Sequence, residues 1–553
     1  MKTLKLTYFF LSVLIFVSCS NQPKYSGAVV TGHPEATKIG IQVLQDGGNA
    51  VDAAISVQLA LAVCLPNAGN IGGGGFMIYR SHNGQSHALD FREKAPQASS
   101  KNMYLDKHDN TIDSLSTYGP LAVGIPGTID GIFAAHKKFG SIGIDTLFNY
   151  AIDLASNGFP ITKTQAKEFN YFQADFRKFN PHNKYFQADL WEEGDTLKQL
   201  DLAKTLNIIK DHGRSGFYEG EIANSIVETM GNSGIISLID LKNYKSIWRE
   251  PIQLHFGEYE LISMPPPSSG GIALSQLLMM LSNFDINDIT HNSTEYIHLI
   301  SEIEKRVYAD RAMHLGDMDY YKVPINQLMS FSYNQQRAYD VNWSKATPSD
   351  SISHGDFNDS ESEETTHFSI VDTQGNAVSV TTTLNTSYGS KVFVKNRGFL
   401  LNNEMDDFSS KPGSPNVYGL LGSEANSIEP GKRMLSSMTP SIIEKNKELF
   451  LVLGTPGGST IITSVFQTIL NVILYDMDIQ SAVDAPRFHH QWKPEFIYME
   501  KELYSESLNK SLFNMGHSIK KRNSIGHVNA IMFNDSISIG ADKRGDNTGE
   551  ILQ

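Results

Sequence analysis

Two threonines stand at a boundary where a hydroxyl could become an unusual nucleophile. Thr365 and Thr366 follow the acidic, serine-rich residues 349–364, whose composition is typical of a flexible linker, and they open a run typical of a strand. If the chain is cut after Glu364, Thr365 carries a free α-amine beside its own hydroxyl. The amine can then act as general base for that hydroxyl, which is the chemistry of an N-terminal threonine nucleophile.

The pattern after Thr365 predicts a hairpin that brings a second hydroxyl to the first. Residues 366–371 and 377–383 both alternate, and the connection between them, closed by Gly375, fits a three-residue turn. With Asp372 opposite Asn376, Thr365 faces Thr383, and facing side chains have Cβ atoms about 4.5–5.5 Å apart. A bulge would turn Thr383 to the other face, and an ordinary threonine-rich hairpin shows the same alternation.

Several elements must surround this hairpin. The sequence predicts a strand over 28–31, a helix from Pro34 to Gly47 and a buried helix from Ala50 to about Leu65. The four glycines of residues 72–75 run into a further strand. This glycine run is not a phosphate loop, because a phosphate loop opens a helix. Residues 100–350 are expected to be mostly helical.

Composition limits the classes of function. Hydrophobic residues make up 40% of the 553 residues and charged residues 19%, which is typical of a globular protein. The net charge of −14 argues against nucleic acid as a partner, because a phosphate-binding surface needs basic patches.

The N-terminus has the pattern of an export signal, residues 1–18, with Lys2 and Lys5 before a short apolar run. Cys19 directly after the expected cleavage point resembles a lipoprotein site, with residues 19–27 as a linker. These features predict an exported protein, periplasmic or anchored to the outer membrane as a lipoprotein, whose only membrane contact is the lipid. The alternative is an ordinary secretory signal in which Cys19 has no role.

The second of the two cysteines, Cys64, lies in an apolar run. The run predicts that Cys64 is a small buried hydrophobic residue, and the alternative is a catalytic thiol.

A set of ordered motifs resembles the γ-glutamyltransferases (γ-glutamyl transpeptidases), which are N-terminal nucleophile hydrolases. The resemblance runs from about Ala28 to the C-terminus and rests on these motifs: Gly72-Gly-Gly-Gly-Phe76, Asp90-Phe-Arg-Glu93, Met264-Pro-Pro-Pro-Ser-Ser-Gly-Gly271, Thr365-Thr-His-Phe-Ser-Ile-Val-Asp372, Leu400-Leu-Asn-Asn-Glu-Met-Asp-Asp-Phe408, Leu435-Ser-Ser-Met438 and Gly454-Thr-Pro-Gly-Gly-Ser459. Two departures are Phe368, where the family often has tyrosine, and Glu404, where it has glutamate or glutamine.

The resemblance implies an α+β fold, a four-layer αββα sandwich with both subunits in one intertwined core. It also implies a proenzyme that cuts itself between Glu364 and Thr365. The large subunit would span 28–364 and the small catalytic subunit 365–553, and the two would remain together as a heterodimer.

The resemblance also assigns roles to individual residues. Thr365 would be the nucleophile, Thr383 would orient it, and the backbone N–H groups of Gly457 and Gly458 would form the oxyanion hole. The residues expected to bind the substrate α-carboxylate are Arg92, Ser436 and Ser437. Those expected to bind its α-ammonium are Asn385, Glu404 and Asp407. Tyr418, in the loop 412–419, would cover the site.

The implied donor is glutathione or another γ-glutamyl compound, and the acceptor is water, an amino acid or a dipeptide. No metal or organic cofactor is implied. Two alternatives remain open: a related acylase that acts on a β-lactam side chain or another γ-glutamyl amide, and a non-catalytic surface lipoprotein. Singly, Arg92 could also be a structural salt-bridge partner, and the two glycines could simply turn the chain.

Overall fold

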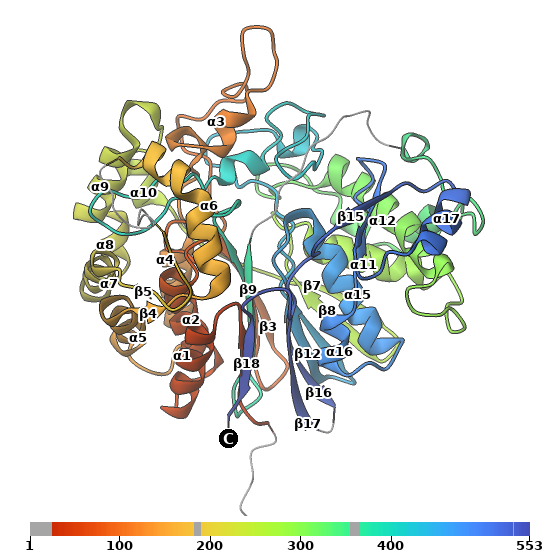
Figure 1. Ribbon diagram of the computed structural model, residues 1–553, viewed down its shortest axis with the longest axis horizontal. Helices are drawn as coiled ribbons and strands as arrows, with labels where there is room; N and C mark the ends of the chain where they lie inside the picture. The colour runs from red at the N-terminus through yellow and green to blue at the C-terminus, as the bar shows by residue number, and fades with distance from the viewer. Residues whose placement is uncertain (1–24, 182–189, 354–364, 535, 553) are drawn as a thin grey trace, which may run out of the picture.

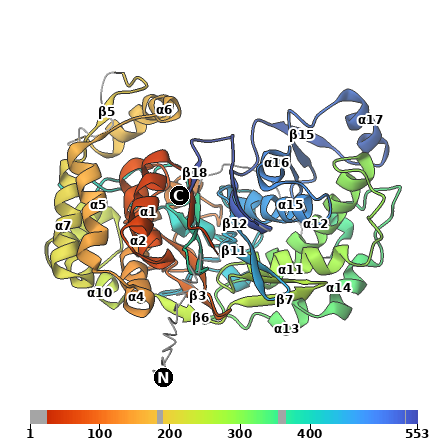
Figure 2. The same ribbon diagram turned by 90° about the horizontal axis from the view of Figure 1, so that it is seen from below.

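Two large β-sheets lie face to face in the computed structural model, and helices cover the outer face of each (Figures 1 and 2). The structure describes residues 25–181, 190–353, 365–534 and 536–552. The layers follow the order helix, sheet, sheet, helix, so the expected four-layer αββα arrangement is confirmed.

The first sheet has seven strands. Their spatial order is β18 (Thr548–Ile551), β1 (Ala28–Thr31), β9 (Thr366–Val371), β10 (Ala377–Thr383), β2 (Gly74–Arg80), β3 (Ser86–Asp90) and β6 (Ile247–Arg249).

The second sheet has six strands, in the order β17 (Ser536–Ala541), β16 (Asn529–Asn534), β12 (Glu448–Gly454), β11 (Ser441–Lys445), β8 (Tyr259–Ser263) and β7 (Ile252–Phe256). Smaller pairings join β13 (Phe488–His489), β14 (Ile497–Glu500) and β15 (Ile519–Arg522), and also β4 (Phe159–Pro160) and β5 (Thr196–Leu197).

Helices from the first half of the chain cover the first sheet, and later helices cover the second (Figure 1). The first group comprises α1 (Pro34–Gln45), α2 (Ala50–Cys64), α4 (Thr128–Phe139), α5 (Ile144–Asn157), α7 (Leu200–His212), α8 (Arg214–Tyr218), α9 (Gly220–Met230) and α10 (Leu238–Asn243), with α3 (Asp113–Thr117) and α6 (Lys163–Phe179) at its edge. The second comprises α11 (Gly270–Leu281), α12 (Thr294–His314), α13 (Ile325–Leu328), α14 (Phe331–Ala338), α15 (Ile461–Ile473), α16 (Ile479–Asp484) and α17 (Glu506–Asn514).

The β9–β10 hairpin has the predicted register. Ala377 pairs with Val371 and Thr382 with Thr366, and the turn is closed by Gly375 at φ 89°. Successive side chains in a strand point to opposite faces. Phe368 therefore packs into the core beneath α2, while Val371 belongs to the core between the two sheets.

Both sheets mix strands from before and after residue 364. In the first sheet β9 and β10 lie between β1 and β2, and in the second β11 pairs with β8. The C-terminal β18 also pairs with β1. Both parts of the chain therefore contribute side chains to the same hydrophobic cores, as the resemblance implies.

Residues 100–350 are mostly helical, as expected, but they also contain short strands. Residues 247–263 contain β6, β7 and β8, of which β8 lies inside the second sheet. These strands are short, with three residues in β6 and five each in β7 and β8. Among the described residues, no helix is both long and apolar enough to span a membrane.

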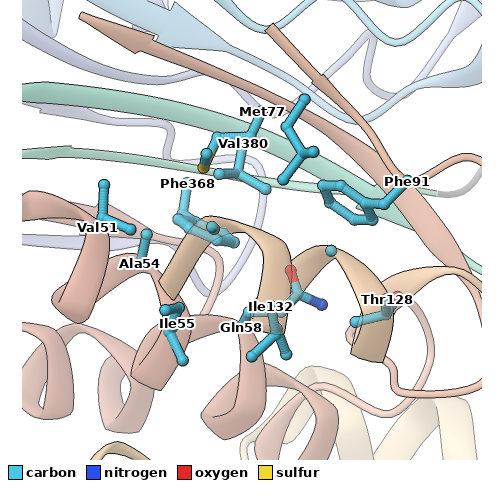
Figure 3. A pocket seen from close by; sticks show the side chains of 13 residues that line it. Val51, Ala54, Ile55, Gln58, Met77, Phe91, Thr128, Ile132, Phe368 and Val380 are labelled. Atoms are coloured by element: carbon cyan, nitrogen blue, oxygen red, sulfur yellow. The ribbon is translucent and has the colours of Figure 1, made fainter. Parts of the chain in front are cut away.

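An apolar cavity of ≈ 30 Å³ lies under the hairpin, between α2, α4 and the first sheet (Figure 3). Its wall includes Phe368 and Val380 from the hairpin and Gln58 from α2. The side-chain amide of Gln58 donates to the Asn70 carbonyl and the Thr382 hydroxyl, but its carbonyl oxygen has no hydrogen-bond partner among the described residues. A buried acceptor left without a donor costs about 1–3 kcal/mol.

We expect Phe368→Tyr to stabilise the protein. The added hydroxyl occupies part of the cavity and can donate to the Gln58 oxygen, which should raise the free energy of unfolding by about 1 kcal/mol. Thermal unfolding measures the change. Phe368→Leu is the matched control, and it should lower the free energy of unfolding by about 1–2 kcal/mol because it enlarges the cavity. A lower melting temperature for Phe368→Tyr would contradict this account of the cavity.

Candidate active site

Thr365 lies at the start of β9, where the first sheet opens into a small cavity. Its side-chain oxygen is 3.5 Å from that of Thr383 on β10, the outer limit of a hydrogen bond. Both residues are buried, and both line a cavity of ≈ 20 Å³. The facing threonine pair predicted from the hairpin register is therefore confirmed.

Thr383 is fixed by the chain that follows it. Its hydroxyl oxygen accepts a 2.7 Å hydrogen bond from the backbone N–H of Asn385, which has φ 78°. The same oxygen also accepts from the Thr365 hydroxyl at 3.5 Å, so Thr383 holds the Thr365 side chain as an acceptor. Asn385 in turn donates from its side chain to the Asn403 carbonyl at 3.0 Å.

A guanidinium surrounded by carboxylates forms another wall of the cavity. Arg92 follows β3, and Asp90 holds it by accepting its backbone N–H at 3.0 Å. Its guanidinium lies 2.5 Å from a Glu404 oxygen, forms an ion pair with Asp407 and lies 3.5 Å from Glu93. Arg92, Glu93 and Glu404 are fully buried.

These carboxylates are held in a costly environment. Burial raises the pKa of Glu404, of Asp407 and of Glu93, and the positive charge of Arg92 only partly opposes this effect. Three buried negative charges around one cation repel each other, so the cluster favours a state in which a proton is retained.

Two serines face the cluster from a segment held by the proline-rich motif. Ser436 and Ser437 line the cavity. Backbone hydrogen bonds join Ser436 to Pro267 at 2.9 Å and to Ser269 at 2.8 Å. The proline-rich motif before α11 therefore fixes the serine segment through a short parallel β-bridge. Neither serine lies at the start of a helix.

The glycine pair lies where β12 turns into α15. Gly457 has φ 135° and Gly458 has φ 51°, conformations that favour glycine. Neither backbone N–H donates to an acceptor within the described ranges. Gly458 lines the cavity and Gly457 does not. A Cβ on Gly458 would come within 2.5 Å of the Tyr418 ring, so this glycine also permits the approach of the tyrosine.

The loop 412–419 covers the cavity. Tyr418 is buried, and its hydroxyl donates to the Asn385 carbonyl at 2.6 Å. Asn416 donates to Asp407 at 3.1 Å, and the N–H of Val417 donates to Asp406 at 2.9 Å. The loop is therefore tied to the carboxylates beneath it, in the closed position that the sequence predicts for Tyr418.

All predicted site residues within the described ranges line this one cavity except Gly457, which precedes the cavity-lining Gly458 in the sequence. Glu364 and Cys19 lie outside the described residues. Cys64 is fully buried in α2, and burial raises the pKa of its thiol, which opposes formation of a thiolate.

Sequence reasoning missed two charged residues at the site. Glu93 belongs to the motif of Arg92, but the resemblance assigns it no role, and Arg311 on α12 lies outside the motifs that carry the resemblance. Arg311 donates to Ser437 Oγ at 2.9 Å and to Ser269 Oγ at 2.9 Å. Its surroundings gave no signal, because α12 carries many charges and resembles a solvated helix in sequence.

Among the residues that the structure describes, one other group has the residue types of a metal site. His298, Glu302 and His517 lie together and are buried. Glu302 already has cationic partners, Lys305 at 2.5 Å and Arg306 at 2.9 Å. Burial opposes ionisation of Glu302, but Lys305 and further hydrogen bonds lower its pKa to about 2. These two side chains supply the positive charge that a metal ion would bring, so the group is a structural ion network.

The pKa of Asp406 predicts a pH-dependent stability. Burial raises this pKa to about 7, although Ser116 and Val417 donate to the carboxylate. An unfolded aspartate has a pKa of about 3.9. The protonated Asp406 side chain therefore contributes fully to the free energy of unfolding below about pH 4, and this contribution is lost as pH rises through 7. The free energy of unfolding falls by at most about 1.4 kcal/mol per pH unit in this range.

We expect Asp406→Asn to remove this component, because the amide remains neutral and can still accept from Val417. Melting temperatures between pH 4 and 8 should fall less with pH in Asp406→Asn than in the wild type. Asp145→Asn, at an exposed position on α5, is the control. Equal slopes for Asp406→Asn and wild type would show that Asp406 does not take up this proton.

Comparisons with known proteins agree with this arrangement. The family model for Gamma-glutamyltranspeptidase matches residues 36–552. The chain is 43% identical over 513 residues to the glutathione hydrolase proenzyme of Escherichia coli (strain K12), covering 92% of this chain and 88% of the relative. It is 44% identical over 537 residues to the protein of the same name from Pseudomonas aeruginosa, covering 95% of each.

Comparison with solved structures also points to the γ-glutamyltranspeptidases. The Helicobacter pylori γ-glutamyltranspeptidase matches with 43% identity and a TM-score of 0.57 over 58% of this chain and 93% of that one. A cephalosporin acylase from Bacillus halodurans matches with a TM-score of 0.83 over 95% and 96%, but at 24% identity this likeness shows the fold alone. The chain therefore belongs to the γ-glutamyltranspeptidase family.

Proposed function

We propose that the chain is a proenzyme that cuts itself between Glu364 and Thr365 and then works as a γ-glutamyltransferase and glutathione hydrolase. The observation that carries the proposal is the presence of the Thr365–Thr383 pair and the Arg92–Glu404–Asp407 cluster around one cavity. The names of the E. coli and P. aeruginosa relatives, glutathione hydrolase proenzyme, support both the processing and the substrate.

Cleavage would change the chemistry of Thr365. While its nitrogen is in a peptide bond it cannot accept a proton, whereas a free α-amine has a pKa of about 7.7–8.0 and is partly unprotonated near neutral pH. That amine would take the hydroxyl proton as the oxygen attacks the γ-carbonyl. Thr383 would hold the attacking oxygen in place, since its own oxygen is already fixed by the Asn385 N–H.

The rest of the cavity fits the two charges of a γ-glutamyl group. The carboxylates of Glu404 and Asp407, with the side chain of Asn385, would hold the α-ammonium. Arg92, Ser436 and Ser437 would hold the α-carboxylate, since a guanidinium can bind a carboxylate through two charge-assisted hydrogen bonds. An ammonium that arrives beside buried acids also makes their ionisation less costly.

The oxyanion would form next to the glycine pair. The N–H groups of Gly457 and Gly458 donate to no acceptor in the part of the chain that the structure describes, so both are available to a developing negative charge. The acyl-enzyme on Thr365 would then pass its γ-glutamyl group to water or to an amino acid or dipeptide, which gives ping-pong kinetics.

The remaining parts of the proposal concern the cell. The two fragments would stay together as a heterodimer of large and small subunits, since they share both sheets. The export signal and Cys19 favour a periplasmic or outer-membrane-anchored protein, held by lipid alone. A related acylase is the second candidate, because the chain is 33% identical over 535 residues to the Acylase ACY 1 proenzyme of a Pseudomonas species. A β-lactam side chain is one substrate that such an acylase would take. The charged Arg92 cluster favours the zwitterionic γ-glutamyl group.

The processing is tested by Thr365→Ala. We expect the purified wild type to give two fragments, the smaller beginning at Thr365, and Thr365→Ala to remain a single chain. N-terminal sequencing and intact mass identify the fragments, and release of p-nitroaniline from a γ-glutamyl anilide measures the mature activity. Thr365→Ser is the control and should still be cut. An uncut wild-type chain with full activity would exclude the mechanism.

Thr383 gives a second test of the nucleophile. Thr383→Val removes the hydroxyl that holds Thr365 and leaves the Asn385 N–H without its acceptor, whereas Thr383→Ser keeps both contacts. We expect Thr383→Val to slow turnover of the γ-glutamyl anilide by about tenfold or more, the effect of losing about 1.4 kcal/mol or more from the transition state. If Thr383→Val and Thr383→Ser have equal turnover, the hydroxyl does not orient Thr365.

A further inference from the structure

Arg311 is a buried cation beside the active-site cavity, and it has no anionic partner among the described residues. Its side chain comes from α12 and is 4% exposed. No carboxylate of the described residues lies within 4.0 Å of its guanidinium, which donates hydrogen bonds to two serine hydroxyl groups. Buried arginines nearby differ, since Arg92 and Arg433 each form ion pairs with carboxylates. A buried charge without a partner is costly.

The two contacts of Arg311 lead directly to the cavity. Its Nη2 donates to Ser437 Oγ at 2.9 Å, and Ser437 lines the cavity that contains Thr365. Its Nε donates to Ser269 Oγ at 2.9 Å, and Ser269 donates onward to the Ser436 carbonyl at 2.7 Å. One guanidinium therefore fixes both ends of the Ser436–Ser437 segment.

The direction of these hydrogen bonds leaves the Ser437 proton available. Ser437 Oγ accepts from Arg311, and its hydroxyl donates to no acceptor among the residues the structure describes. A hydroxyl that accepts from a cation becomes a stronger donor, because hydrogen bonds in a chain polarise one another. The arrangement therefore points a polarised O–H toward whatever anion enters the cavity.

The electrostatics of the site show why a second cation is needed. Arg92 already faces Glu93, Glu404 and Asp407, so its charge is compensated before a ligand arrives. Arg311 lines a neighbouring cavity of ≈ 10 Å³ that shares Asp407 and Leu420 with the first. Burial lowers the pKa of Arg311, and the nearby Asp407 only partly opposes this effect. An incoming carboxylate would offset the positive charge that the protein leaves unpaired.

We propose that Arg311 is a positioning residue for the α-carboxylate of the γ-glutamyl donor, acting through the hydroxyl of Ser437. The inference rests on the proposed function, because it assumes that this carboxylate binds at Ser436 and Ser437. It adds a residue of the large subunit, far from Arg92 in sequence, to the part of the site that selects the donor.

The test compares two donors that differ only in the carboxylate. γ-Glutamyl-p-nitroanilide carries the group, and 4-aminobutyryl-p-nitroanilide lacks it. We expect Arg311→Met to raise KM for the first donor about tenfold or more, with kcat changed much less, since the weakened contact is a hydrogen bond to a charged group that forms when the donor binds. For the second donor kcat/KM should change less than about twofold.

A double-mutant cycle identifies the route through Ser437. Ser437→Ala should reproduce most of the effect, and adding Arg311→Met to it should change KM little further. Arg311→Lys keeps the charge, serves as the second variant if Arg311→Met does not fold, and should be intermediate. Arg337→Met is the matched control, because Arg337 pairs with Asp310 next to Arg311 but does not line the cavity, so it should leave KM unaltered.

Equal losses for both donors, or additive effects of Arg311→Met and Ser437→Ala, would overturn the proposal and make Arg311 a structural residue. If the wild type cleaves neither donor, the proposed function fails, and calorimetric binding of L-glutamate against 4-aminobutyrate decides the role of Arg311. Weaker L-glutamate binding in Arg311→Lys would then support the proposal, and equal or absent L-glutamate binding would overturn it.

Discussion

The pairing register of the β9–β10 hairpin is the constraint on which the rest of the structure depends. Side chains alternate along a strand, so a slip of one residue would move every side chain of β9 to the other face. Phe368 would leave the core beneath α2, and Thr365 would no longer face Thr383. The same packing that stabilises the first sheet therefore also aligns the two hydroxyls.

A second constraint is electrostatic. The Arg92 guanidinium and the carboxylates of Glu404 and Asp407 line the cavity, and Arg311 lines the cavity beside it. Arg92, Arg311 and Glu404 are buried. Burying such charges is expensive unless they are paired, and imperfect pairing leaves protons and charges that a ligand can balance. The loop 412–419 that covers the cavity takes part in this charge balance. Asn416 donates to Asp407, and the N–H of Val417 donates to Asp406. Closure of the loop and the charge of the site are thus linked.

Much of this could be predicted from the sequence because the signals are local. The hairpin, the first strand, the helices of residues 34–64 and the glycine turn at 457–458 each follow from periodicity or from glycine conformation. The short strands of residues 247–263 were missed, because their position inside a sheet is decided by tertiary pairing with β11 and β3. Arg311 was missed because nothing local shows that a charged helix such as α12 is buried along most of its length.

The interleaved strands have a consequence for the life of the processed protein. Both cysteines of the chain precede residue 364, so no disulfide can join the two fragments. Yet β9 and β10 lie between strands of the other fragment, so the fragments cannot part without exposing two cores. The two fragments should therefore separate only when the protein unfolds, and not when it is merely diluted. Bond cleavage would free one amine while leaving the cooperative unit intact.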